Sequence, residues 1–247
     1  MISRFLPLFL VAVWACGPLR AAPEKTKSST VFQVSTLGAL SQGVYDASVP
    51  MGEVLKRGDF GLGTLRNLDG EVVILNGQAF QIDVSGRVRR VEKREMTPFA
   101  VVTRWRDTGA KISAKDVVMA ELQTRLESAM KPNLPYAIRI RGEFKNLKLR
   151  SVPAQKPPFP VLGEVVAKQT VFQIPRVQGT LVGFRFPKFM AGLNLPGFHF
   201  HFLSDDKKQG GHFLSGDAVA ASAQTLELRE FGMILPRDVG FDEQKLD

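Results

Sequence analysis

Cysteine is almost absent from this chain: Cys16 is the only one among 247 residues. A single thiol cannot form an intramolecular disulfide, so no disulfide framework stabilises the fold. If the N-terminal segment that contains Cys16 is removed, the mature chain has no thiol at all, and cysteine cannot serve as a metal ligand or nucleophile there.

Several other features are missing, and each absence excludes a class of protein. No segment after residue 22 is long and apolar enough to form a transmembrane helix. The glycine-rich stretch at residues 58–64 (GDFGLGT) lacks the lysine and the strand–loop–helix setting of a phosphate-binding loop. The formal charge of +9 is spread along the chain without a basic tract interleaved with aromatic residues. The sequence therefore predicts no nucleic-acid partner.

The first 22 residues predict a signal peptide. Arg4 supplies a short basic region, residues 5–14 form an apolar run, and small residues follow. Cleavage is expected near Gly17 or Ala22. Residues 13–16 (VWAC) also loosely resemble a lipoprotein cleavage box, in which case Cys16 would carry a lipid anchor. In either case we expect a secreted or periplasmic protein.

The pattern of apolar runs predicts a mixed, sheet-rich α/β fold with few helices. Asp-Gly, Asn-Gly and Ser-Gly pairs separate strand-like runs between residues 62 and 92, which is typical of a β-meander. One long helix is expected over residues 114–130, where Leu122 and Leu126 belong to an apolar stripe. One short helix is expected with Ser35 or Thr36 as its cap, and another with Ser48 as its cap, Pro50 in its first turn and Gly58 as its stop. Further strands are expected over residues 99–105, 137–144, 165–174, 179–186, 198–203 and 225–234.

Proline-rich residues 151–163 (SVPAQKPPFPVLG) predict a boundary between two sheet-based subdomains. The N-terminal subdomain is expected over residues 30–162 and would contain the long helix. The C-terminal subdomain is expected over residues 163–247 and would contain the histidine-bearing strand.

All three histidines fall in one short segment. Side chains on a strand alternate between its faces, so His199 and His201 share one face, and the phenylalanines between and beside them share the other. A turn at the Gly210-Gly211 pair could return His212 to the same place. Three imidazoles with an open position are the ligand set of a catalytic zinc site. Iron, copper, nickel and manganese also accept histidine, so the metal stays open on this argument.

Asp205 and Asp206 follow the histidine strand directly. They could orient the imidazole N–H groups as hydrogen-bond acceptors, or they could be solvated turn residues. The sequence favours neither interpretation.

The segment GTLVGFRFPKFMAGLNLPGFHFHFLSDDKKQGGH resembles the metal-binding region of the bacterial α-acetolactate decarboxylases. So do the segments VFQVSTLGALSQGVYD, GDFGLGTLRNLDGEVVILNGQAFQI, TPFAVVTRW and RGEFKNLKLRSVPAQ. The resemblance runs from about residue 31 to residue 235, and the G-[YF]-H-x-H-F-L-S-D-D and G-G-H elements occur in the family's order.

The resemblance implies decarboxylation of (S)-2-acetolactate to (R)-acetoin and CO2, with a 2-hydroxy-3-keto acid as substrate and a homodimer as the usual assembly. It implies that Zn²⁺ is bound by His199, His201 and His212 and acts as the electron sink for an enediolate. It places an arginine at Arg150 and a glutamate at Glu71 in the catalytic site.

These residue types suit that chemistry. A guanidinium matches a carboxylate bidentately, so Arg150 could hold the substrate carboxylate. Glu71 could relay the proton that quenches the enediolate. Without the resemblance, both residues would be interpreted as surface charges. Thr180 and Ser204 are weaker candidates for the pocket.

The C-terminal segment departs from the family pattern. The resemblance implies a second glutamate from a C-terminal tail, and Glu243 is the only glutamate in the last segment, LPRDVGFDEQKLD. Whether Glu243 takes that role stays open.

Two other functions stay open beside the decarboxylase. The first is a zinc hydrolase in which Glu71 acts as the base on metal-bound water. The second is a non-catalytic protein that binds a metal or a ligand on the same scaffold.

Overall fold

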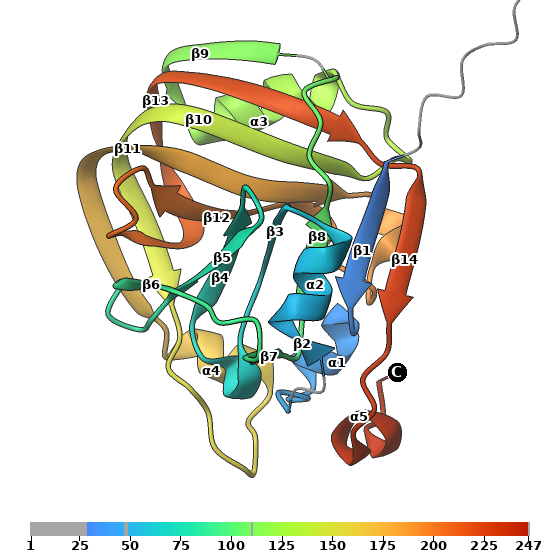
Figure 1. The fold of residues 1–247 in the computed structure, drawn as a ribbon. Helices are drawn as coiled ribbons and strands as arrows, with labels where there is room; N and C mark the ends of the chain where they lie inside the picture. The colour runs from blue at the N-terminus through green and yellow to red at the C-terminus, as the bar shows by residue number, and fades with distance from the viewer. Residues whose placement is uncertain (1–28, 47–48, 110, 247) are drawn as a thin grey trace, which may run out of the picture.

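The computed structural model describes residues 29–46, 49–109 and 111–246. The predicted signal peptide and Cys16 lie outside these residues. Two β-structures dominate the chain: an open sheet and a second sheet that closes into a barrel (Figure 1). The predicted sheet-rich α/β class is therefore confirmed. Within the described residues, no helix is both long and apolar enough to cross a membrane.

The open sheet has the strand order β14-β1-β8-β3-β4-β5-β6. Its β4–β5 hairpin turns at Asn76 and Gly77, whose φ values of 53° and 73° match the twist that tight hairpins need. The predicted meander is thus present. The strands are β1 (Thr30–Val34), β3 (Phe60–Gly63), β4 (Glu71–Leu75), β5 (Gln78–Ile82), β6 (Val88–Arg90), β8 (Ala100–Thr103) and β14 (Glu230–Ile234).

Short elements surround this sheet. The predicted helix after Thr36 is present as α1 (Leu37–Ser41), and the Thr36 hydroxyl caps it by accepting a hydrogen bond from the Ala39 amide at 3.1 Å. The helix expected with Pro50 in its first turn is α2 (Met51–Arg57), which begins just after Pro50 and ends before Gly58. Its predicted cap, Ser48, lies outside the described residues. The other short elements are β2 (Val49–Pro50), η1 (Arg66–Leu68), β7 (Met96–Thr97), η2 (Lys188–Met190) and α5 (Val239–Glu243).

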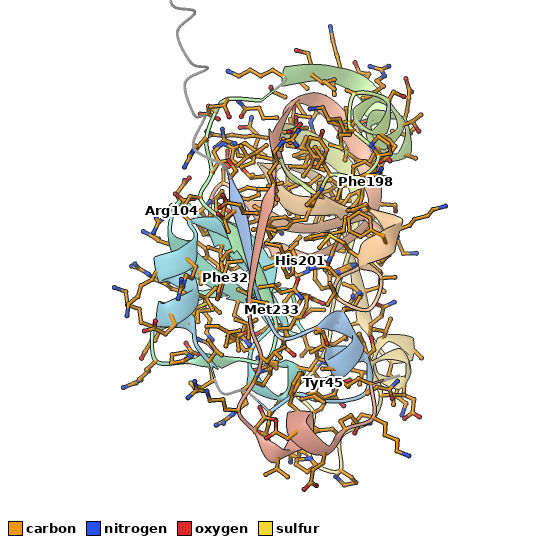
Figure 2. All side chains as sticks on the ribbon, turned by 90° about the vertical axis from the view of Figure 1, so that its right-hand side faces the viewer. Phe32, Tyr45, Arg104, Phe198, His201 and Met233 are labelled. Atoms are coloured by element: carbon orange, nitrogen blue, oxygen red, sulfur yellow. The ribbon has the colours of Figure 1, made fainter. Side chains whose placement is uncertain are left out.

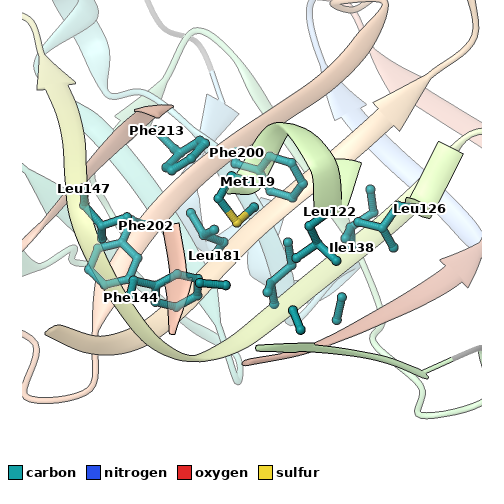
Figure 3. Close-up of a cluster of buried hydrophobic side chains, with 14 of the residues drawn as sticks. Met119, Leu122, Leu126, Ile138, Phe144, Leu147, Leu181, Phe200, Phe202 and Phe213 are labelled. Carbon is teal, nitrogen blue, oxygen red and sulfur yellow. The ribbon is translucent and has the colours of Figure 1, made fainter. Parts of the chain in front are cut away.

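The second sheet has the order β10-β11-β12-β13-β9, and an additional pairing of β10 with β13 closes four of its strands into a barrel. Its strands are β9 (Lys111–Val118), β10 (Tyr136–Ser151), β11 (Thr170–Phe186), β12 (Gly197–Ser204) and β13 (Gly210–Glu227). Helix α3 (Met119–Ser128) packs into this core through Met119, Leu122 and Leu126, and Met119 lies beside Phe200 (Figure 3).

The outer face of the barrel packs against the open sheet. A shared apolar cluster joins Leu62 and Val73 of the open sheet to Val182, Phe184 and Leu203 of the barrel. Strand β12 therefore lies with one face on the barrel core and the other face against β4. This second face is the one that carries His201.

Two predicted elements are wrong in type. Residues 114–118 are not helical but belong to β9, where Ala114 pairs with Ala221 and Val117 with Ala218. Pairing with β13 outweighs the helical periodicity, because it buries Ala114 and Val117 in the barrel core. Residues 165–167 belong to helix α4 (Leu162–Ala167) rather than to a strand, and β11 begins only at Thr170.

The sheets also divide the chain differently from the proline-rich segment. Strands β9 and β10 belong to the barrel although they precede residue 162, and β14 returns to the open sheet by pairing with β1. Both arrangements depend on long-range pairing, which local composition does not encode. The division into domains at residues 162 and 163 stays a prediction.

Candidate metal centre and catalytic pocket

The three histidines meet where β12 and β13 pair. His201 lies directly opposite His212 in the antiparallel register, and His199 lies two residues earlier on the same face of β12. Figure 2 shows His201 in the interior of the molecule. Phe200 and Phe202 point the other way into the barrel core, as the alternation predicts.

The spacing of the imidazoles suits a metal ion. The candidate ligand atoms of His199, His201 and His212 all lie within 4.8 Å of one another. The Nε2 atoms of His199 and His201 are 3.2 Å apart. Tetrahedral zinc with bonds of about 2.0–2.1 Å separates its nitrogen ligands by roughly 3.3 Å. The predicted cluster therefore has the dimensions of a metal site.

A backbone carbonyl sets the orientation of His201. Its Nδ1 lies 2.8 Å from the carbonyl oxygen of Val72 on β4. Since a carbonyl can only accept, Nδ1 carries the proton and Nε2 keeps the lone pair for a metal. The proposed role of Asp205 and Asp206 is therefore wrong for His201. Asp206 instead accepts a hydrogen bond from the Ser204 hydroxyl at 2.7 Å.

Glu71 and Arg150 stand beside the histidines, although both are distant in sequence. One carboxylate oxygen of Glu71 lies 2.7 Å from Arg150 Nη1, and the other lies 3.2 Å from His201 Nε2. Arg150 Nη2 is 3.2 Å from His212 Nδ1. Strand β4 supplies the glutamate, and β10 supplies the arginine through its pairing with β13, which places Arg150 opposite His212. The structure thus brings together all five predicted site residues.

Burial decides the charge states in this group. It lowers the pKa of His201 to about 3, and the positive charge of Arg150 adds to the effect. Burial likewise holds the pKa values of His199 and His212 well below their usual range. The pKa of Glu71 is raised by burial, which the nearby Arg150 partly offsets. Neutral imidazoles are the form that ligates a metal, and a raised carboxyl pKa suits proton transfer near neutral pH.

The group opens into a cavity of about 300 Å³. Its polar lining includes the three histidines, Glu71, Arg150 and Thr64, together with Ser41 of α1. Its walls are mostly apolar and come from distant parts of the fold, which are α1, the end of β3, η1, the residue before β8, the residues after β10 and before β12, and α4. The apolar wall residues are Leu37, Leu40, Leu62, Leu68, Phe99, Val152, Leu162 and Leu195.

Comparison with known proteins identifies the family. Residues 31–247 match the family model for alpha-acetolactate decarboxylase. The chain belongs to the α-acetolactate decarboxylase family. The alpha-acetolactate decarboxylase of Methylococcus capsulatus is 39% identical over 223 residues, which cover 87% of this chain and 86% of that protein. That of Klebsiella aerogenes is 34% identical over 232 residues, which cover 94% and 89%.

The fold agrees with solved structures of the α-acetolactate decarboxylase family. The crystal structure of the Bacillus subtilis strain 168 enzyme superposes with a TM-score of 0.86 at 30% identity, covering 89% of this chain and 94% of that one. A Staphylococcus aureus protein described as of unknown function and similar to alpha-acetolactate decarboxylase superposes with a TM-score of 0.85 at 27% identity. The superposition covers 88% of this chain and 94% of the Staphylococcus aureus protein.

The weaker candidates lie away from the cavity. Thr180 lies on β11 opposite Leu203 and lines a different cleft. Ser204 is buried and closes the turn after β12 by hydrogen bonds with Asp206 and with the backbone of Lys208 and Gln209. Glu243 is exposed on α5 and is not among the described residues that line the cavity.

Reasoning from the sequence missed the apolar wall and Thr64. Thr64 is 4% exposed, and its hydroxyl donates to the Gly70 carbonyl at 2.7 Å, which ties the end of β3 to the turn before Glu71. The family-like segment around residue 64 was a usable indication of its importance. The wall residues of α1 and α4 had none, because their positions depend on how distant segments pack.

His201 gives the metal-free protein a pH-dependent stability. Its pKa is about 3 when folded and about 6.5 in an unfolded chain. Below pH 6.5 the unfolded state therefore binds more protons at this site than the folded state does. As the pH is lowered, the free energy of unfolding decreases by about 1.4 kcal/mol per pH unit. Glutamine can still donate a hydrogen bond to the Val72 carbonyl but does not titrate. We therefore expect His201→Gln to lose the part of this pH dependence that comes from the protonation of His201. Urea unfolding in chelator between about pH 6 and pH 5 measures it; an unchanged slope contradicts a neutral buried imidazole.

Proposed function

We propose that this protein decarboxylates (S)-2-acetolactate to (R)-acetoin and CO2, with zinc as its metal. The observation that carries the proposal is the placement of Glu71 and Arg150 against the histidine cluster at the floor of one cavity. Family membership supports the same activity.

His199, His201 and His212 would hold the metal. Three neutral imidazoles leave its positive charge undiminished, and their spacing fits tetrahedral zinc better than the larger, oxygen-preferring ions. When bound, the metal supplies a Lewis acid that stabilises the negative charge left by the departing CO2.

Arg150 would bind and orient the substrate carboxylate. Its side chain is only 14% exposed, so a carboxylate that reaches it exchanges water for a charge-assisted hydrogen bond in a desolvated site. Nη1 already donates a hydrogen bond to Glu71 at 2.7 Å. Nη2 contacts the His212 imidazole at 3.2 Å, and a substrate carboxylate can replace that contact.

Glu71 would deliver the proton that completes acetoin. Loss of CO2 leaves an electron pair on the carbon that held the carboxylate, and one proton must reach that carbon. A carboxyl group whose pKa is raised by burial carries a proton at a higher pH than an exposed glutamate does. The apolar walls exclude bulk water, so proton delivery from a fixed direction can set the configuration of the product.

Acetoin release tests this proposal directly. The purified mature protein is incubated with racemic acetolactate, with and without a chelator, and acetoin and CO2 are measured together. We expect equal amounts of both, loss of both in chelator, and recovery when zinc is restored. A folded, zinc-loaded sample that releases neither product contradicts the decarboxylase. Hydrolysis of esters or amides without CO2 would favour the hydrolase in its place.

Two further properties belong to this proposal. We propose that residues 1–22 direct secretion or periplasmic export, with Cys16 as a possible site of lipid attachment, because the segment has the basic, apolar and small-residue order of a signal peptide. We also propose a homodimer. The sizes of the purified mature protein by mass spectrometry and by light scattering test the cleavage and the dimer, respectively.

A further inference from the structure

A second cleft lies on the outer face of the barrel, away from the histidines. Its volume is about 570 Å³, larger than that of the catalytic cavity. Strands β10, β11 and β13 form its floor, and the β4–β5 turn at Leu75 and Asn76 forms part of its rim. No residue of β12 lines the cleft. Asp205, which follows the strand directly, does, and it is four residues after His201, which is roughly 13 Å along a strand.

The cleft carries an excess of positive charge. Its cationic side chains are Lys111, Arg139, Arg141 and Lys207, whereas its only carboxylates among the described lining residues are Asp107 and Asp205. Two positive charges are therefore left over. In a concave surface such an excess attracts small anions more strongly than the same charges on a convex surface do.

The cations are not all committed to protein partners. Arg139 is fixed, since it stacks on Trp105 at 4.6 Å and donates to Asp107 and Gln224. Arg141 is different: its side chain is 72% exposed, and its nearest carboxylate oxygen, on Asp205, is 3.8 Å away. An exposed ion pair at that distance contributes little free energy, so an incoming anion can replace it at small cost.

Thr180 provides a buried polar group in the same cleft. The residue is only 3% exposed. Its hydroxyl has no hydrogen-bond partner among the described residues, yet it is not one of the fully enclosed unpaired atoms, so it is open to the cleft. A hydroxyl that is open to the cleft and has no protein partner can hydrogen-bond to water or to a ligand there.

The strand registers place Thr180 next to Arg141. Arg141 lies directly opposite Thr180 on β11 and opposite Ser222 on β13. Directly opposite side chains on one face have Cβ atoms about 4.5–5.5 Å apart. Arg141 thus lies between two hydroxyl-bearing residues in the sheet. The guanidinium and the hydroxyls are donors that suit the oxygens of a carboxylate or phosphate group.

We infer that this cleft binds a small metabolite that carries about two negative charges as carboxylate or phosphate groups. Arg141 pairs with one anionic group, the hydroxyls of Thr180 and Ser222 donate to its oxygens, and Lys111 and Lys207 neutralise the remaining charge. The inference does not depend on the catalytic chemistry, because no histidine, Glu71 or Arg150 lines the cleft.

Calorimetric titration of the zinc-loaded mature protein with inorganic phosphate, and separately with malonate, tests the inference. Ionic strength is held constant with NaCl, so that screening does not change. We expect one site with a Kd on the order of 1 mM for at least one probe, and a matching rise in Tm. Binding of phosphate alone assigns a phosphate ester, binding of malonate alone assigns a dicarboxylate, and either supports the site.

Three variants locate the binding. Arg141→Gln is expected to weaken binding about tenfold or more, since it removes a charged partner. The matched control, Arg176→Gln, changes another exposed barrel arginine, one that pairs with Glu143 and does not line the cleft. It should bind the probe as the unchanged protein does. Arg150→Gln should also keep this binding, which separates the cleft from the catalytic cavity.

Thr180→Val separates a ligand role from a structural one. Valine keeps the shape and removes a hydroxyl that has no protein partner, so we expect unchanged or higher Tm together with severalfold weaker anion binding. No binding of either probe beyond that of NaCl overturns the inference. So does binding that Arg141→Gln leaves intact, or binding that only Arg150→Gln removes.

Discussion

Replacing His199 by alanine is expected to remove the bound metal and the catalytic turnover together. His199 Nε2 lies 3.2 Å from His201 Nε2, so the variant deletes one corner of the ligand triangle. We expect metal affinity to fall by more than about 100-fold, since even changes outside the ligand shell cost 10–100-fold. Decarboxylation should fall by at least about 1,000-fold. Metal content after dialysis and acetoin release measure the two effects on the same sample.

The control for His199→Ala is a change on the same segment that spares the ligands. Asp206→Ala removes only a turn carboxylate, which accepts from Ser204 and from the Lys208 amide. It should keep both metal and activity. The chain offers no further histidine to replace a lost ligand, because it has only three. A metal-free His199→Ala protein with full activity would contradict the proposed mechanism.

Replacing Arg150 by glutamine should separate metal binding from turnover. All three histidines stay in place, so we expect the metal to remain bound. The substrate carboxylate loses its buried charged partner, and a change of this kind costs about 2–5 kcal/mol, or roughly 30- to 4,000-fold in rate. Acetoin formation with metal content measured in parallel checks this expectation. Loss of the metal in Arg150→Gln would instead make Arg150 a support of the ligands.

Two further variants make the result for Arg150 interpretable. Glu71 loses its ion-pair partner in Arg150→Gln, and its pKa rises further as a buried, unpaired carboxyl. Arg150→Lys keeps the positive charge beside Glu71 but cannot bind a carboxylate bidentately. If Arg150→Lys is as inactive as Arg150→Gln, the bidentate geometry matters; if it is fully active, the charge alone suffices. Arg176→Gln again serves as the exposed arginine control.

Local sequence patterns predicted the features that depend only on neighbouring residues, such as the face of a strand on which a side chain lies. The alternation of histidine and phenylalanine placed His199 and His201 on one face of β12. The residue pairs that end in glycine predicted the turns of the meander; in one of them, Asn76 and Gly77 both adopt positive φ. Of the two candidate caps, Ser35 and Thr36, it is Thr36 that caps the helix.

The errors occurred where distant pairing opposed a local preference. Residues 114–118 have helical spacing, yet two of them are buried by pairing with β13, more than a hundred positions later in the chain. Thr180, a weaker candidate for the catalytic pocket, lines the second cleft instead. Which face of β11 meets the open sheet, and where along that face a cleft is left, depends on packing between the two sheets.

By itself, the sequence predicted the candidate ligand set of three histidines, with two of them on one strand face, because strand alternation is a local property. The turn predicted at the Gly210-Gly211 pair is wrong: the chain turns at residues 205–208, and both glycines belong to β13. Only the tertiary structure decided the surroundings of that set. It placed the Val72 carbonyl against His201 and brought Glu71 and Arg150 from β4 and β10. It also buried His201 and Glu71 deeply enough to shift their proton equilibria. Burial and long-range pairing are properties of the packed chain, and they convert a histidine cluster into a candidate catalytic site.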